Sequence, residues 1–160
     1  MRYGTMVRLP EDCDLGAVCK EKFSRVREMG LDSCQLIYKP AVYEEANADV
    51  IRAAAEDMGV TISAMFCGYR DTEYFWDNHF DFVLTGINSP IFGGERIRYL
   101  LSAIPFLKRL GVSDMIIHAG YIPNNTYENG YSLMLSAAVL LGKRLKAQGC
   151  NLLFGHCCIY

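Results

Sequence analysis

Apolar residues recur every three to four positions in several stretches of the chain, which is the spacing of an amphipathic helix. The clearest stretch runs from Leu15 to Met29, where Asp14 is placed to cap the helix and Gly30 to end it. Similar spacing predicts further helices at about 47–58, 95–110 and 131–148. Pro105 lies inside the third of these four helices, so we expect a kink or a break there.

Short apolar and β-branched runs stand between these helices and predict strands. The runs are Thr5–Leu9, Ser33–Tyr38, Val60–Cys67, Asp114–His118 and Asn151–Phe154. Strand and helix therefore alternate, which predicts a parallel sheet with helices packed outside it. With each strand placed beside the last, the pattern predicts an α/β fold, an incomplete (β/α)8 TIM barrel of about four βα units plus a fifth strand. A doubly wound open sheet is the competing arrangement.

The composition fits a single domain that spans residues 1–160. Hydrophobic residues make up 51% of the chain and charged residues 21%, which is enough apolar material for a core. The net charge of −2 argues against a surface that neutralises many phosphates, so we expect no nucleic-acid partner. The N-terminus lacks a signal-peptide pattern and no apolar run reaches membrane-spanning length, so we expect a cytoplasmic protein without a membrane partner.

Seven cysteines raise the question of disulfides or a metal site. Their number is odd and no CxxC pair occurs, so neither a disulfide framework nor a zinc ribbon is predicted. We expect free thiols in a reducing compartment, most of them buried. The run His156-Cys157-Cys158 does not predict a metal site either, because three adjacent ligands do not readily surround one ion.

Four segments, in their order and spacing, resemble the sugar phosphate isomerase/epimerase family. They are Gly4–Arg8, Met29–Leu36, Ile62–Gly68 and Ile116–Pro123. This family comprises the xylose isomerase-like TIM barrels and is grouped with the type 2 AP endonucleases. The resemblance covers about residues 3–154 and corresponds to the N-terminal half of the barrel.

The resemblance implies metal-dependent isomerisation or epimerisation of a sugar or a sugar phosphate. It also implies a divalent metal, manganese, magnesium or zinc, held by carboxylates and a histidine at the top of the intact barrel. In such chemistry the metal stabilises an ene-diolate while a carboxylate takes the carbon-bound proton.

The chain departs from the family pattern after the fifth strand. Where the family places a metal-binding glutamate, this sequence continues from Phe154 as Gly155-His156, and strands six to eight are absent. We therefore expect a truncated or frameshifted chain that is inactive alone and binds no metal itself, which the DNA downstream of the Tyr160 codon tests. Two alternatives stay open: a half-barrel module completed by a partner chain, and an AP endonuclease-like DNA repair protein. The open strand edges also predict self-association.

Candidate site residues are those that follow the strands, because α/β barrels place their chemistry at the carboxyl ends of strands. His118 ends the fourth strand, and we favour a substrate pocket for it over a purely structural place. The other substrate-binding candidates are Trp76, Cys67, Tyr38 and Arg8, and no complete catalytic set is present. Trp76 would stack on a sugar or pack in its loop, and Arg8 would hold a phosphate or form a surface ion pair. Cys67 is a weak candidate nucleophile, since no base is visibly paired with it.

Alternation along the strands also predicts which side chains face the barrel interior. We assign Met6, Leu36, Ile62, Met65, Ile116 and Leu153 to this face. Because half a barrel would leave these side chains exposed, we expect the chain to be marginally stable and prone to association.

Overall fold

The structure is a computed structural model of the chain and describes residues 3–11, 13–39, 43–67, 86–90, 92–120 and 122–155. Its strands are β1 (Gly4–Val7), β2 (Ser33–Ile37), β3 (Thr61–Cys67), β4 (Asp114–Ile117) and β5 (Asn151–Phe154). Its helices are α1 (Leu15–Glu28), α2 (Asn47–Asp57), α4 (Gly93–Ser102), α5 (Ile104–Leu110) and α6 (Asn129–Lys146). None of these described helices combines the length and the apolar character needed to cross a membrane.

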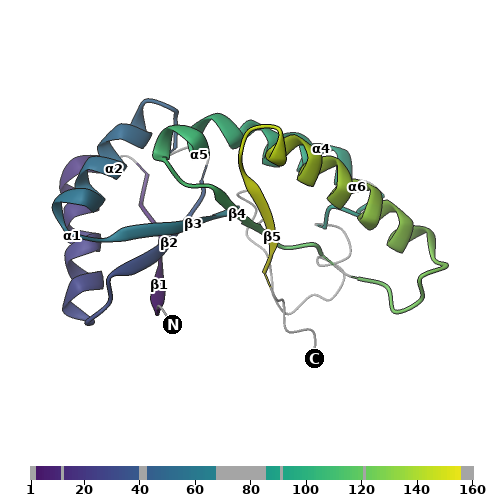
Figure 1. The fold of residues 1–160 in the computed structure, drawn as a ribbon, viewed down its shortest axis with the longest axis horizontal. Coiled ribbons are helices and arrows are strands. Elements are labelled where there is room, and N and C mark those ends of the chain that lie inside the picture. Colours follow the sequence, from purple (N-terminus) through teal and green to yellow (C-terminus); the bar gives the residue numbers. More distant parts are fainter. Residues whose placement is uncertain are drawn as a thin grey trace.

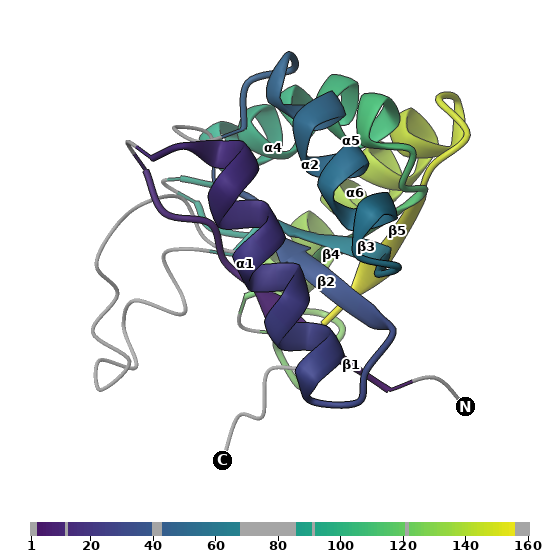
Figure 2. The same ribbon diagram turned by 90° about the vertical axis from the view of Figure 1, so that its left-hand side faces the viewer.

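The five strands form one parallel sheet in the order β1-β2-β3-β4-β5. The described helices lie on one side of this sheet, and no described helix covers its other side, which we call the uncovered face (Figure 1). Seen from the end at which the sheet begins, α1 runs beside β1 and β2 (Figure 2). A doubly wound fold would have a reversal of strand order and helices on both faces. The predicted α/β half-barrel is therefore confirmed, and the open doubly wound arrangement is wrong.

The helix ends follow the local signals in the sequence. The Asp14 carboxylate accepts a hydrogen bond from the Ala17 amide at 3.2 Å, which caps α1. Gly30 follows this helix with φ of 75°, a conformation that favours glycine. The predicted break in the third helix is confirmed, because α4 and α5 are separated at Ala103 and Pro105 lies in the first turn of α5. A proline fits there, since the first amides of a helix have no partner within the helix.

The core lies between the sheet and the helices. Leu36, Met65 and Met115 occupy neighbouring positions on β2, β3 and β4, and all three are completely buried. Laterally paired residues of a parallel sheet point to the same face, so this row faces the helices. The assignment of Leu36 and Met65 to the barrel interior is therefore wrong. Ile62 packs against the same core, so its assignment to the interior is wrong as well.

The uncovered face carries the alternate residues of the strands. Met6 is 49% exposed and Leu153 is 41% exposed, as predicted for side chains of an incomplete interior. Ile116 is half-buried on the same face as Leu153, with which it pairs. Alternation alone did not identify the correct face in β2 and β3, because both faces of these strands carry apolar residues. A bulge at Ser63 also keeps Ile62 and Met65 on one face of β3.

Candidate functional site

His118 lies at the carboxyl end of β4, on the uncovered face of the sheet. Its ring meets the Phe66 ring edge to face, with 4.9 Å between the ring centroids. Phe66 pairs laterally with Ile116, two residues before His118, so both rings stand on the same side of the sheet. The imidazole is only half-buried. It is therefore placed to touch a ligand that lies against this face.

The surroundings of His118 favour its neutral form. Burial lowers its pKa below the usual 6.5, and the positive charge of Arg96 lowers this pKa further, while a hydrogen bond with the backbone of Gly155 acts in the opposite direction. A neutral imidazole has one nitrogen that donates and one that accepts a hydrogen bond. The N–H of the neutral His118 ring donates to the Gly155 backbone, and its other nitrogen can accept a hydrogen bond from a hydroxyl group.

Arg96 is a buried cation close to the same strand ends, and sequence reasoning missed it. Its side chain comes from α4 and is 5% exposed, and its Nη2 donates to the Cys67 carbonyl at the end of β3 at 2.8 Å. The guanidinium also lies over the Tyr99 ring, with its carbon 5.2 Å from the ring centroid. The available signal was spacing, because Arg96 lies on the buried stripe of α4 between Gly93 and Leu100.

The segment 86–90 packs against the turn that follows His118. The Ile87 amide donates to the Ala119 carbonyl at 3.0 Å, and a Cβ on Gly86 would lie 2.7 Å from the Cα of Gly120. Gly120 has φ of 88°, so both glycines are needed for this close approach. The contact buries the polar side chains of two residues in the segment, Asn88 and Ser89. Sequence reasoning did not single these residues out, since they lie far from any predicted strand end.

Cys67 and Tyr38 follow strands as predicted, but their side chains are buried among the helices. Cys67 is completely buried beside Ile117, and burial raises the pKa of its thiol to about 12, so the thiol stays protonated. Tyr38 is 8% exposed and stacks on Tyr43, with 5.7 Å between ring centroids. Burial also raises the pKa of Tyr38 to about 12. Neither side chain is brought together with His118 on the uncovered face.

The remaining candidates do not complete a site. Arg8 follows β1 and is exposed. Trp76 lies outside the residues that the structure describes. Among the described residues, no group of three or more His, Cys, Asp or Glu side chains is placed to hold a metal ion. The residues described at this end of the sheet therefore do not fit the metal centre that the family resemblance implies, and we derive no step through a metal.

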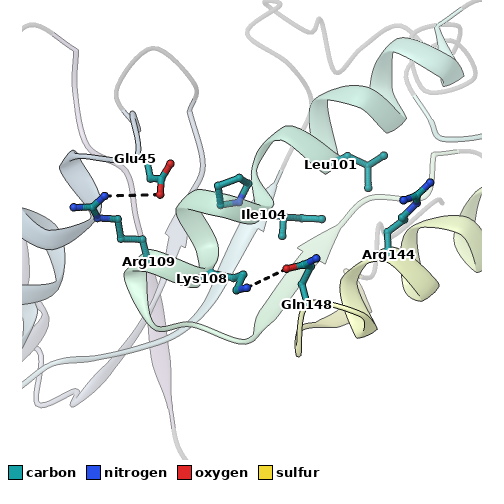
Figure 3. A pocket seen from close by; sticks show the side chains of 8 residues that line it. Glu45, Leu101, Ile104, Lys108, Arg109, Arg144 and Gln148 are labelled. Carbon is teal, nitrogen blue, oxygen red and sulfur yellow. Dashed lines mark hydrogen bonds and ion pairs between the residues drawn. The ribbon is translucent and has the colours of Figure 1, made fainter.

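A surface groove lies on the outer side of the helices, away from the uncovered face (Figure 3). It is lined by Glu45, Leu101, Ile104, Pro105, Lys108, Arg109, Arg144 and Gln148. Lys108 donates to Gln148 across it at 3.0 Å, and Arg109 forms an ion pair with Glu45 at 3.8 Å. Two of its three cations thus already have partners within the chain, and the groove contains none of the strand-end residues.

No protein-family model matches this sequence, and a search of curated proteins finds no match. The fold, however, matches solved structures. A xylose isomerase domain protein from Planctomyces limnophilus superposes with a TM-score of 0.77 at 14% identity, covering 95% of this chain and 52% of that one. D-psicose 3-epimerase from Clostridium cellulolyticum gives 0.65 at 14% identity, with coverage of 95% and 51%. An AP endonuclease of family 2 from Brucella melitensis gives 0.62 at 12% identity, with coverage of 96% and 55%.

These three structures share one architecture with this chain despite low sequence identity. The chain spans about half the length of each of them. All three proteins bear names of the groups that the sequence motifs resemble. The described residues therefore have the fold of one half of a xylose isomerase-like TIM barrel.

Proposed function

We propose that this chain provides one half of a sugar-binding barrel of the isomerase/epimerase type, with His118 and Phe66 in the wall of the sugar site. The observation that carries the proposal is the half-buried His118 ring set against Phe66 on the uncovered face at the end of β4. The similarity to D-psicose 3-epimerase supports the substrate class.

The chemistry of the two rings suits a sugar. An aromatic ring provides an apolar surface for the C–H groups of a pyranose or furanose. A neutral imidazole beside it can accept a hydrogen bond from a sugar hydroxyl through the nitrogen that does not bond Gly155. The low pKa of His118 keeps this arrangement available at neutral pH.

We also propose that the chain does not interconvert sugars by itself. Moving a proton next to a carbonyl needs a base and a group that stabilises the negative charge of the ene-diolate. Among the described residues, no group of three or more His, Cys, Asp or Glu side chains that could hold a metal ion accompanies His118. Metal-dependent interconversion of sugars would then require a completed barrel.

Sugar binding is tested by following the imidazole signals of the 160-residue chain by NMR during titration with D-fructose and with D-fructose 6-phosphate. We expect a saturable shift of the His118 signal, which the His118→Gln variant identifies among the three histidines. Phe66→Leu should weaken the shift, while Leu133→Ala on α6 should leave it unchanged. The two ligands distinguish a sugar site from a sugar phosphate site. An unmoved His118 signal with both ligands contradicts the proposal.

Turnover is tested on the same preparation with added manganese and a panel of ketoses and ketose phosphates. We expect no interconversion above a vector-only preparation. Metal-dependent epimerisation by the purified chain would contradict the second part of the proposal and leave the binding site intact.

The AP endonuclease alternative ranks lower, although such a protein shares the fold. Tight binding of DNA requires several Lys or Arg side chains facing the phosphates. The net charge of −2 and the lack of a metal-ligand group among the described residues give it no specific support.

A further inference from the structure

Two basic clusters that are far apart in the sequence lie together on the outer surface of the helices. They are Lys108 and Arg109 in the last turn of α5, and Lys143, Arg144 and Lys146 in the last turn of α6. The Lys108 ammonium donates to the side-chain oxygen of Gln148 at 3.0 Å, which joins the end of α5 to the turn after α6. The groove of Figure 3 runs between these two helix ends. The fold therefore gathers positive charge along this groove, although the whole chain has a net charge of −2.

Two cations of the groove carry a positive charge that no described carboxylate pairs with. Arg109 is neutralised, because its guanidinium contacts the carboxylates of Asp49 at 2.8 Å and Glu45 at 3.8 Å. Lys108, in contrast, donates to an amide, which has no net charge. Arg144 forms no hydrogen bond or ion pair within the described part of the chain. An anion that enters the groove would thus meet the charges of Lys108 and Arg144.

The wall of the groove that belongs to α4 and α5 is apolar. Leu101, Ile104 and Pro105 line it, and the row continues along the chain to Lys108. Figure 3 shows Leu101 and Ile104 on this wall and Arg144 on the wall that belongs to α6. The groove has a volume of about 860 Å³, which is the size of a site for a small molecule. Its shape therefore suits a ligand with an apolar body.

The dipole of α6 explains only part of this arrangement. Cations in the last turn of a helix are favourable in whichever direction their side chains point. Lys143 and Lys146 meet this need with exposed side chains that do not line the groove. Arg144 instead projects into the groove beside Leu101. Its planar guanidinium matches the geometry of a carboxylate or a phosphate, which it can hold with two hydrogen bonds.

We propose that this groove binds a small organic anion. Its carboxylate or phosphate lies between Lys108 and Arg144, and its apolar body packs against Leu101, Ile104 and Pro105. Both parts are needed, because an exposed ion pair alone contributes little in water and the apolar wall adds the burial of surface. The ligand differs from a sugar phosphate, whose body is covered by hydroxyl groups. The site lies on the outer side of the helices, goes beyond the proposed sugar site and does not depend on it.

The test titrates the 160-residue chain by isothermal titration calorimetry with octanoate and with octyl phosphate. Octanamide has a similar chain without the charge, and inorganic phosphate has the charge without the chain. We expect saturable binding of octanoate or octyl phosphate, and binding of the two control compounds that is at least about fivefold weaker. The tighter of the first two probes identifies the head group that the site prefers. Added salt should weaken the binding of this probe.

Substitutions locate the site. Arg144→Gln and Lys108→Gln should each weaken binding of the tighter probe about threefold to fivefold, which is the upper range for an exposed ion pair. The matched control is Lys143→Gln, which removes the same charge from the same helical turn but from a side chain outside the groove. This control should change the affinity by less than about twofold. Urea unfolding of each variant should show that the fold is kept.

The proposal is overturned if neither octanoate nor octyl phosphate binds, or if both bind no more tightly than the control compounds. It is also overturned if neither Arg144→Gln nor Lys108→Gln weakens binding, since the probe would then lie elsewhere, such as on the uncovered face. An equal loss in Lys143→Gln would show a general attraction to the basic end of α6 and overturn it too. The sugar titration of His118 is independent of all these results.

Discussion

Arg96 and His118 show how one buried charge sets the chemistry of a neighbouring group. The guanidinium is held by the Cys67 carbonyl at 2.8 Å and by the face of the Tyr99 ring. From this position it opposes protonation of the imidazole, after the larger effect of burial. The position of His118 was predicted from its place at a strand end. Arg96 was not, because a charged residue inside a helix is normally assigned to the exposed face.

Replacing Arg96 by Met should raise the pKa of His118 toward its usual value while keeping the side chain long and apolar. An NMR titration of the imidazole signal between pH 4 and 8 measures this. Arg98→Met is the control, because Arg98 lies on the exposed side of the same helix. An unchanged pKa in the Arg96 variant would show that burial alone lowers the pKa of His118.

The lowered pKa of His118 also makes the free energy of unfolding depend on pH. As pH falls through about 6.5, the unfolded chain binds a proton at this histidine before the folded chain does. The free energy of unfolding should therefore fall from that pH down to the pKa of the folded state and then level off. Because Arg96→Met brings the two pKa values closer, it should flatten this part of the pH dependence.

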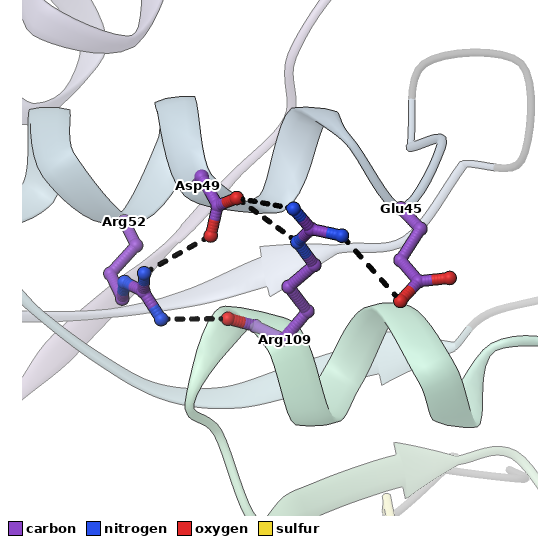
Figure 4. A network of polar contacts seen from close by, with 4 residues as sticks. All are labelled: Glu45, Asp49, Arg52 and Arg109. Atoms are coloured by element: carbon purple, nitrogen blue, oxygen red, sulfur yellow. Dashed lines mark hydrogen bonds and ion pairs between the residues drawn. The ribbon is translucent and has the colours of Figure 1, made fainter.

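At the scale of elements, a polar network joins α2 to α5 on the outer surface (Figure 4). Arg109 of α5 donates to the Asp49 carboxylate of α2 from Nε at 3.0 Å and from Nη2 at 2.8 Å. Arg52 of α2 contacts the same carboxylate at 3.0 Å and donates to the Arg109 carbonyl at 2.9 Å. The network fixes the ends of two helices that are far apart in the sequence. Helix periodicity does not reveal such a network, since it involves only exposed positions.

Asp49→Asn should weaken the packing of α2 on α5 by a small amount that disappears at high salt, because these groups are exposed. Arg109 lowers the pKa of Asp49 chiefly through their hydrogen bonds. The stabilisation is thus present above about pH 3.8 and is lost as pH falls through the lower pKa of the folded state. Urea unfolding at pH 7 and at pH 2.5 measures the difference, with Glu56→Gln, which changes an exposed carboxylate elsewhere on α2, as a control. If Asp49→Asn lowered the free energy of unfolding equally at both pH values, the effect would not come from the charge of Asp49.

At the scale of the whole molecule, the repeated strand–helix units could be predicted from the sequence, because each unit buries one apolar face against its neighbours. The order of the strands and four of the helix stops follow from apolar spacing and from glycines such as Gly30 and Gly111, which have φ of 75° and 80°. The sequence pattern did not predict which face of each strand points toward the core. In β2 and β3 both faces carry apolar side chains, so the helices, rather than the pattern, decide which face is the core.

This correction changes the expected stability of the isolated chain. Leu36 and Met65 are completely buried under the helices, so the half-barrel has a core of its own, while Met6 and Leu153 remain exposed on the other face. Leu36→Ala should lower the free energy of unfolding by about 2–5 kcal/mol, whereas Leu153→Ala should change it by less than about 0.5 kcal/mol. Urea unfolding measures both values. The dye ANS should bind the wild-type chain at its uncovered face. Met6→Lys combined with Leu153→Lys should reduce this binding without lowering the unfolding midpoint, because Met6 is already 49% exposed and Leu153 41% exposed. A broad, non-cooperative transition in the wild-type chain would instead show that the helix-covered core does not hold the half-barrel together alone.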